Sequence, residues 1–443
     1  MSKRIKVVWI CHVQNPMLRE KIPVGVSKLE HIVRKILHKP EITSCPDVAQ
    51  WITNGAYEMQ SFQDEVELYI VSPGYALKDR YFEFVENGVH YCLYRNEDYE
   101  FGKILKNKLF HNQYQSQYKK NRRRIKHYID AIQPDIVHLI GLENQFYALS
   151  LLDVSTDIPT IAQLTALLND PDFFSHFFMS KKEYDYRAEI ERKILMRADY
   201  LGTGAKKFTK IIYESIRPDA IILNTSLALT EELNASDTEK EFDFVYFAVN
   251  ISKAIDLALE AFIIASKKRP DITLDVIGGC PEDLKQTLEE RLLKEGLTRN
   301  VIFEGKLPTH DDVLKQIRKS RFALLPLKID LTSGTIREAM ANGLPVLTTD
   351  TGDLGTQKLN ATLETAMITT IGDSEALANN MLRLLQEPEV GENLRKNAFE
   401  LHSKRKSNNE IVKHYIDIYR ACLNHFHRDE PIPDSCITKI ENK

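Results

Sequence analysis

The sequence lacks the cysteine patterns that mark a disulfide framework or a zinc site. Its 443 residues contain six cysteines, which are scattered along the chain without a Cys-x-x-Cys pair or a histidine partner at zinc spacing. We therefore expect reduced thiols and no metal site.

Long hydrophobic runs are also missing. No stretch of about 18 apolar residues occurs, so we expect no membrane-spanning helix. The first apolar run, Lys6–Cys11, is too short for a signal-peptide core and has no small-residue cleavage site after it. It is typical of a first buried strand. We expect a cytoplasmic protein whose contact with a membrane, if it has one, is peripheral and at the inner face.

The chain carries no strong excess of charge. A formal net charge of -4 gives no global attraction to nucleic acid, and we expect no nucleic-acid partner. One local basic stretch occupies residues 119–126, on a segment with helical periodicity. Its cations are Lys119, Lys120, Arg122, Arg123, Arg124 and Lys126. This stretch is either a solvated helix face or a cationic surface that rests on anionic lipid headgroups.

The length exceeds what one hydrophobic core usually supports, which favours two domains. Both halves alternate short β-rich apolar runs with helical patterns. Examples are the strand Ile5–Ile10, the helix Tyr184–Arg197, the strand Phe244–Ala248 and the helix Ile255–Ser266. Such alternation predicts an α/β fold with two Rossmann-like, doubly wound parallel sheets, whose ligands bind at the carboxyl ends of the strands in a central cleft that the two domains face.

The domain boundaries follow from a polar, acidic segment between Thr230 and Phe242, which we interpret as the linker. We predict an N-terminal domain over 1–235, a C-terminal domain over 241–405, a helix over 406–425 that packs back on the N-terminal domain, and a loose tail over 426–443.

The most informative segment is Leu324–Thr348, LLPLKIDLTSGTIREAMANGLPVLT. It contains Asp330 and, eight positions later, Glu338, separated by a small-residue turn at the start of a helix. Free backbone N–H groups at such a helix start can receive diphosphate oxygens or sugar hydroxyls. The segment resembles the signature of glycosyltransferase family 4, in which an acidic residue precedes Glu-Ala-Met-Ala-x-Gly-x-Pro-Val.

The resemblance implies a GT-B type fold, a retaining transfer and roles for particular residues. Asp330 would hold hydroxyls of the donor hexose, and Glu338 would accept hydrogen bonds from the vicinal ribose hydroxyls of the nucleotide. The turn residues Ser333, Gly334 and Thr335 would contact the diphosphate or the sugar. An alternative for Glu338 is a capping box with Thr335, in which the carboxylate satisfies only the N–H groups of its own helix.

Further positions that match the family surround the nucleotide. Gly278 and Gly279 follow one predicted strand, and Gly305 and Lys306 follow the next, where relatives approach the nucleobase. In the N-terminal domain, Gly25 corresponds to a glycine turn near the donor phosphate and the acceptor. The alternative for these glycines is ordinary turn chemistry or tight helix packing.

The sequence also departs from the family pattern. Asp330 is one methylene shorter than the usual glutamate. Of the two cations that neutralise the diphosphate in relatives, Lys253 is present, but the arginine position holds Ala248 or Val249 and the glycine after the lysine is Ala254.

A second group of departures lies in the N-terminal domain. Many relatives carry a histidine after the strand that ends here in Gln163 and Thr165, and this chain has none there. We expect His138 at a strand end beneath the site.

These observations predict a retaining glycosyltransferase that moves a hexose from a nucleoside diphosphate sugar to a saccharide or lipid-linked saccharide acceptor. Its setting would be surface polysaccharide or glycoconjugate synthesis. The donor would be a substrate, and no cofactor or metal would be required. Because the leaving diphosphate can take the acceptor proton, positioning and electrostatic stabilisation would carry catalysis. Two alternatives are a nucleotide-sugar epimerase on the same scaffold and a non-catalytic nucleotide-binding protein.

Overall fold

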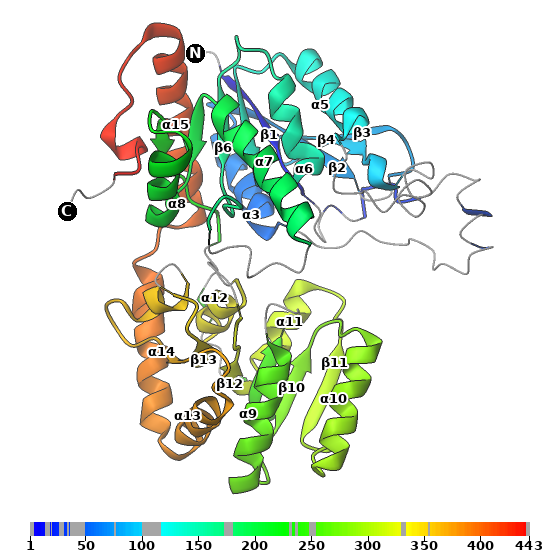
Figure 1. The fold of residues 1–443 in the computed structure, drawn as a ribbon, viewed down its shortest axis with the longest axis vertical. Coiled ribbons are helices and arrows are strands. Elements are labelled where there is room, and N and C mark those ends of the chain that lie inside the picture. The colour runs from blue at the N-terminus through cyan, green and yellow to red at the C-terminus, as the bar shows by residue number, and fades with distance from the viewer. Residues whose placement is uncertain are drawn as a thin grey trace. The chain divides into compact units, whose positions relative to one another are not determined.

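A computed structural model of the chain describes residues 4–13, 18, 20–25, 31–32, 35, 49–74, 77–99, 117–171, 180–229, 233–234, 238–247, 254–328, 334–352 and 355–439. The chain divides into two compact units (Figure 1). The first consists of residues 1–229 and 406–443, and the second of residues 230–405.

The first unit is built on an eight-stranded sheet. Its strands, in spatial order, are β3 (Tyr81–Glu86), β4 (Val89–Arg95), β2 (Val66–Gly74), β1 (Ile5–Ile10), β5 (Ile136–Ile140), β6 (Thr160–Gln163), β7 (Tyr200–Gly202) and β8 (Ile222–Leu223). All neighbours are parallel except β3 and β4, which form an antiparallel hairpin. Order along the chain reverses between β1 and β5, which makes this the switch point of the sheet.

Helices cover both faces of this sheet. The helices α3 (Gln50–Met59) and α15 (Asn408–Arg428) share one hydrophobic cluster with inward residues of β1 and β2. The helix α5 (Lys119–Ile132), whose buried residues lie outside that cluster, packs against β4 and β2 from the other face. The remaining helices of the unit are α6 (Gln145–Ala148), α7 (Lys181–Arg197) and α8 (Lys206–Ile211).

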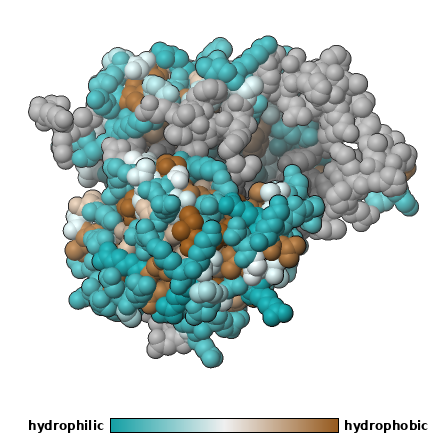
Figure 2. Space-filling view, turned by 60° about the horizontal axis from the view of Figure 1, so that its bottom comes forward, coloured by the Kyte–Doolittle hydropathy of each residue, from teal (hydrophilic) through white to brown (hydrophobic). Residues whose placement is uncertain are grey.

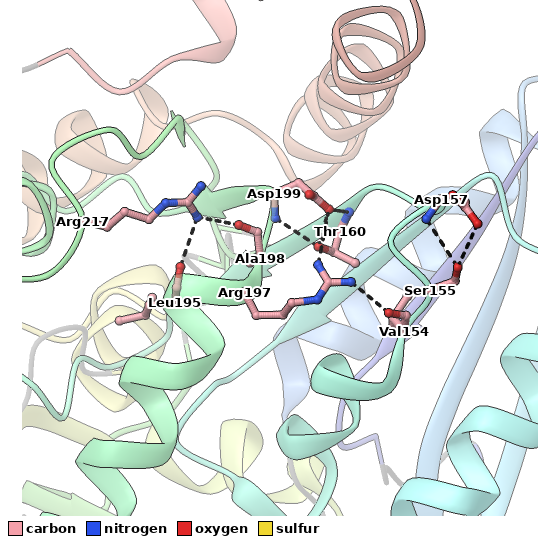
Figure 3. A network of polar contacts seen from close by, with 9 residues as sticks. All are labelled: Val154, Ser155, Asp157, Thr160, Leu195, Arg197, Ala198, Asp199 and Arg217. Carbon is pink, nitrogen blue, oxygen red and sulfur yellow. Dashed lines mark hydrogen bonds and ion pairs between the residues drawn. The ribbon is translucent and has the colours of Figure 1, made fainter.

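A polar network at the amino end of β6 joins it to β7 and to the end of α7 (Figure 3). Asp199 accepts hydrogen bonds from the backbone N–H of Thr160 at 2.9 Å and from its hydroxyl at 2.7 Å. Arg217 donates to the carbonyl oxygens of Leu195 and Ala198, which the end of α7 leaves without helical partners. At the amino ends of β6 and β7, these polar groups are therefore hydrogen-bonded to one another.

The segment after α15 differs from the loose tail that the sequence predicts for 426–443. The helix continues to Arg428, and a short 3-10 turn, Asp434–Cys436, follows it. Cys436 accepts a hydrogen bond from the N–H of Asn224, and the N–H of Thr438 donates to Ile222, both at 2.8 Å. The segment differs from the prediction because β8 is the last strand of the sheet, whose free backbone groups pair with this segment, and because Cys436 is buried in the hydrophobic cluster of the first unit.

The second unit is a six-stranded parallel sheet. In spatial order its strands are β11 (Val301–Gly305), β10 (Leu274–Ile277), β9 (Phe242–Phe247), β12 (Ser320–Leu324), β13 (Val346–Thr349) and β14 (Ala366–Thr369). Its helices are α9 (Ile255–Lys268), α10 (Glu282–Lys294), α11 (His310–Ile317), α12 (Gly334–Ala341), α13 (Ser374–Gln386) and α14 (Pro388–Ser403). The switch point of this sheet lies between β9 and β12.

Alternation along β9 shows why both faces are covered. Phe244 and Tyr246 belong to a cluster that includes α9, α10 and α13, whereas Val245 and Phe247 belong to a second cluster that includes α11 and α12. All four side chains are buried, as expected of a central parallel strand. The sequence-based prediction of two parallel-sheet α/β domains is confirmed.

The residue before α9 is in a strained conformation. Ala254 has φ 40° and ψ 51°, in the left-handed region that glycine adopts at little cost. The family pattern has glycine at this position. We predict that Ala254→Gly stabilises the protein by about 0.5–1 kcal/mol, because relief of the left-handed strain exceeds the entropy cost of glycine. Chemical denaturation measures the free energy of unfolding of this variant. The control is Ala258→Gly inside α9, which should lower the free energy of unfolding by about 1 kcal/mol. Destabilisation by both changes would refute the prediction.

Candidate functional site

The carboxyl ends of β9 and β12 flank the switch point of the second sheet, where open α/β sheets bind ligands. The segment after β12 leads into α12, and the segment after β9 leads into α9. The ends of β10 and β11 lie along the same edge because all these strands are parallel.

Glu338 lies in α12 beside the start of α11. Its Oε1 atom is 3.7 Å from Nε2 of His310, and its side chain is 16% exposed. The imidazole Nε2 is buried and forms no hydrogen bond with any described residue. A separation of 3.7 Å is too long for a hydrogen bond, but a hydroxyl group about 2.8 Å from each atom can bond to both. The pair therefore brings a carboxylate oxygen and an imidazole nitrogen together at this edge of the sheet.

The capping-box alternative for Glu338 is wrong. The helix α12 begins at Gly334, so Thr335 already lies inside the helix and cannot be the residue that caps it. By contrast, true capping boxes begin α11, with Thr309 and Asp312, and α15, with Ser407 and Glu410. The carboxylate of Glu338 is therefore not part of a capping box with Thr335.

The glycines of this edge fall into two groups. Gly278 and Gly305 have φ values of 132° and 71°, so backbone conformation explains them, and a hydrogen bond of 2.8 Å joins the N–H of Gly278 to the carbonyl of Gly305. Gly279 and Gly334 have no positive φ, and no described atom lies within 4 Å of where a Cβ would stand. Among the described residues, neither backbone conformation nor crowding requires glycine at these two positions.

Two lysines supply positive charge at this edge. Lys306, which the sequence predicts as a ligand contact, is exposed and follows β11. Lys328 follows β12, and its Nζ atom lies 3.0 Å from a carboxylate oxygen of Asp256 in the first turn of α9. This ion pair spans the switch point of the sheet. Neither Lys328 nor His310 could be predicted from the sequence, because no motif position marks Lys328 and only the fold brings His310 to Glu338.

Three predicted site residues lie outside the described residues: Lys253, Asp330 and Ser333. Their roles stay predictions. The structure does bring Gly278, Gly279, Gly305, Lys306, Gly334, Thr335 and Glu338 to one edge of the second sheet. Gly25 belongs to the first unit, next to Val24, which forms an isolated antiparallel bridge with Leu77.

His138 occupies a different place from the one expected. It lies in the middle of β5 and is fully buried, and its Nδ1 atom is 2.8 Å from the hydroxyl of Tyr419 on α15. Burial lowers the pKa of His138 to about 3, so the ring is neutral. Gln163 is likewise engaged with α15, through a hydrogen bond of 3.1 Å to Tyr415. Both are structural contacts of the first unit.

The basic stretch lies on α5. Arg124 is buried, and Arg122 pairs with Asp153. The other four cations, Lys119, Lys120, Arg123 and Lys126, are exposed. The two alternatives for this stretch, a solvated helix face and a surface that contacts lipid headgroups, both remain predictions.

Among the described residues, no helix is long and apolar enough to cross a bilayer. The face seen in Figure 2 is mostly hydrophilic, with hydrophobic residues in small separate groups.

The described part of the chain also holds no cluster of three or more histidine, cysteine, aspartate or glutamate side chains suited to a metal ion.

Known proteins resemble both the second unit and the whole fold. Residues 230–401 match the model of the family described as Glycosyl transferases group 1. The match thus covers nearly the whole of the second unit. The lipopolysaccharide core biosynthesis mannosyltransferase LpsB of Rhizobium meliloti is 28% identical over 146 residues, which are 32% of this chain and 41% of LpsB. The match thus spans less than half the length of that relative.

Solved structures extend the likeness to nearly the whole chain. Sucrose-phosphate synthase from Thermosynechococcus elongatus aligns with a TM-score of 0.64 and 16% identity, over 94% of this chain and 98% of that one. The Anabaena protein HepE, in complex with UDP and glucose, aligns with a TM-score of 0.59 and 13% identity, over 93% and 98%. At such identities the likeness shows the fold, which is that of GT-B glycosyltransferases.

Proposed function

We propose that this protein is a retaining glycosyltransferase that moves a hexose from a nucleoside diphosphate sugar to a saccharide or lipid-linked saccharide. In the step, the bond between the anomeric carbon and the diphosphate oxygen breaks, and a bond from that carbon to the acceptor oxygen forms on the same face of the sugar. The acceptor proton passes to the leaving diphosphate. No oxidant, reductant or covalent enzyme intermediate is needed.

The observation that carries the proposal is the position of Glu338. Its carboxylate is not used by its own helix, and with His310 it makes a hydroxyl-binding position at the carboxyl edge of a glycosyltransferase domain. The two oxygens of a carboxylate can accept hydrogen bonds from two vicinal hydroxyls. A ribose presents such a pair, and His310 can share one of the two.

The diphosphate would lie at the switch point, beside the start of α12. Gly334 and the N–H groups of the first turn would face its oxygens, where the positive end of the helix dipole favours an anion. Lys328 would supply a cation at the same edge, in place of the arginine that the family has and this chain lacks. Stabilisation of the departing diphosphate in this way lowers the barrier to transfer.

UDP and its sugars are the first ligands to test, because HepE has been solved with UDP and with UDP-glucose. The experiment is a turnover screen of nucleoside diphosphate sugars, with and without simple glycosides as acceptors, together with calorimetry of UDP. We expect UDP binding, and UDP release that rises when an acceptor is present. Donor conversion to an isomeric nucleotide sugar without release of UDP would favour the epimerase, and undetectable nucleotide binding at millimolar concentrations would defeat the proposal.

A charge-specific prediction concerns Lys328. The change Lys328→Ala should weaken UDP binding by about tenfold, because one cation is lost and Asp256 remains beside the phosphates. Binding of uridine, which has no phosphate, should not change. Calorimetry with both ligands tests this, and equal effects on UDP and uridine would contradict the assignment. Stability should fall by less than about 1 kcal/mol, since the ion pair is partly exposed.

A further inference from the structure

The backbone ladder between β12 and β13 stops where the chain leaves β12 for the candidate site. The two strands are parallel, and the N–H of Leu325 donates to the carbonyl of Leu347 at 2.8 Å. Hydrogen bonds in a parallel pair are evenly spaced, two residues apart on each strand. The next bond would therefore run from the N–H of Leu327 to the carbonyl of Thr349. That carbonyl is engaged elsewhere, because it accepts a hydrogen bond of 2.6 Å from the hydroxyl of Thr356.

The side chain of Thr349 takes the place of the missing backbone bond. Its hydroxyl accepts a hydrogen bond of 2.8 Å from the N–H of Leu327 and donates one to the carbonyl oxygen of the same residue. Both residues are fully buried, so water does not compete for these groups. A hydroxyl can do this because it donates and accepts at once. One side chain thus satisfies both backbone groups of Leu327.

Leu327 has no other hydrogen-bond partner in the described part of the chain. Pro326 before it has no N–H group with which to bond β9, the neighbour of β12 on the other side. Lys328 follows directly, and its Nζ atom lies 3.0 Å from a carboxylate oxygen of Asp256. The hydroxyl of Thr349 therefore holds the backbone from which the side chain of Lys328 starts.

Other threonines at this edge support the strands but do not contact Leu327. The hydroxyl of Thr348 donates to the carbonyl of Leu325 at 2.8 Å, and the hydroxyl of Thr369 donates to the carbonyl of Thr348 at 3.3 Å. Each of these bonds joins two strands that backbone hydrogen bonds already pair. Thr349 differs because its hydroxyl holds a residue that lies beyond the end of the ladder.

The place of this backbone matters for a phosphate-binding lysine. A lysine carries a compact point charge on a four-carbon stem, so the position of its Cα decides which oxygens the charge can reach. Contacts between a ligand and its binding groups lose strength when those groups are displaced by about 1 Å. Valine has the shape of threonine but neither donates nor accepts. In its place it would leave both backbone groups of Leu327 buried without a described partner.

We propose that Thr349 is a positioning residue for the diphosphate, and that through Leu327 it sets where Lys328 carries its positive charge. The inference rests on the proposed function, in which Lys328 meets the departing diphosphate. Thr349 acts through the backbone and does not touch the donor. Its effect on affinity therefore requires both the lysine and the phosphates.

The first test is calorimetry of UDP and of uridine with the full chain and its Thr349→Val variant. We expect UDP affinity to fall about fivefold and uridine affinity to stay the same, because only the phosphates meet Lys328. Thr349→Ser keeps the hydroxyl and should bind UDP within about twofold of the wild type.

Thr365→Val is the matched control. Thr365 is 1% exposed, its hydroxyl donates to the carbonyl of Leu359 at 2.7 Å, and it precedes β14 at the amino edge of the same sheet. The change is the same and removes a buried hydroxyl far along the strands from Lys328. We expect a lower melting temperature with unchanged UDP affinity, which separates a loss of stability from a loss of positioning.

A double-mutant cycle then asks whether Thr349 acts through Lys328. In the Lys328→Ala background, Thr349→Val should cause no further loss of UDP affinity, because the cation that it positions is already gone. Equal losses in both backgrounds would overturn the inference. So would a Thr349→Val variant that binds UDP like the wild type, or one that loses UDP and uridine affinity by the same factor.

Two further outcomes have a definite meaning. If Thr349→Val does not fold, Thr349→Cys takes its place under the same criteria, because a thiol forms only weak hydrogen bonds. Normal UDP binding by the wild type with no phosphate-specific effect in the variant defeats this inference alone. Absence of UDP binding by the wild type defeats the proposed function and the inference with it.

Discussion

Replacing Glu338 with alanine should weaken nucleotide binding by about 1.5–3 kcal/mol, which is roughly a 10- to 100-fold rise in Kd. The carboxylate lies beside His310 and is not used by its own helix. Its removal takes away the acceptor for the ribose hydroxyls while the turn at Gly334 stays in place. Because the ribose is common to both ligands, UDP and uridine should lose affinity by a similar factor, as calorimetry can measure.

The stability of the same variant separates the two roles considered for Glu338. Removal of a carboxylate that only binds ribose should leave the melting temperature nearly unchanged. Removal of a capping carboxylate would lower the free energy of unfolding by about 1 kcal/mol. Glu338→Gln keeps one acceptor oxygen and should fall between the wild type and the alanine variant in affinity. A destabilised Glu338→Ala with normal UDP affinity would contradict the assignment.

The second large effect is expected in the first unit, at Tyr419 of α15. Its hydroxyl accepts a hydrogen bond of 2.7 Å from the indole N–H of Trp9 and lies 2.8 Å from Nδ1 of His138. All three residues are buried. Since His138 is neutral, the hydroxyl can donate its proton to Nδ1 while it accepts from Trp9. One hydroxyl thus joins α15 to the two central strands β1 and β5.

We predict that Tyr419→Phe lowers the free energy of unfolding by about 2–4 kcal/mol, because it leaves two buried polar atoms without partners. In a domain of this size that corresponds to a fall of roughly 5–10 °C in melting temperature. Tyr57→Phe is the matched control, since Tyr57 is 51% exposed and should show no change. A melting temperature within about 1 °C of the wild type would show that the hydroxyl is not essential for the docking of α15.

Periodicity predicted the alternating core of the fold well. The strand Ile5–Ile10 has the expected bounds, and α7 and α9 were placed within a few residues. The hairpin β3–β4 was missed, although Asn87 and Gly88, both with positive φ, form a turn that the dipeptide itself signals. The docking of 434–438 on β8 could not be predicted, because it depends on backbone groups of an edge strand far away in the sequence.

Some residues of the candidate site could be predicted from the sequence, and others could not. Glu338 and Gly334 could be predicted as site residues because their spacing is local and belongs to one motif. His310 and Lys328 were missed because each meets its partner through strand order, which no local pattern encodes. His138 was misplaced by a few residues along its strand, and that shift turns an expected neighbour of the site into a buried contact of α15.

We propose that the second unit binds a nucleoside diphosphate at its switch point, with the ribose on Glu338. A crystal structure of the full chain with UDP would place the nucleotide. We predict ribose hydroxyls within hydrogen-bonding distance of Glu338, with the diphosphate at the start of α12. UDP bound elsewhere, or at this edge with the carboxylate of Glu338 turned away from the ribose, would contradict it.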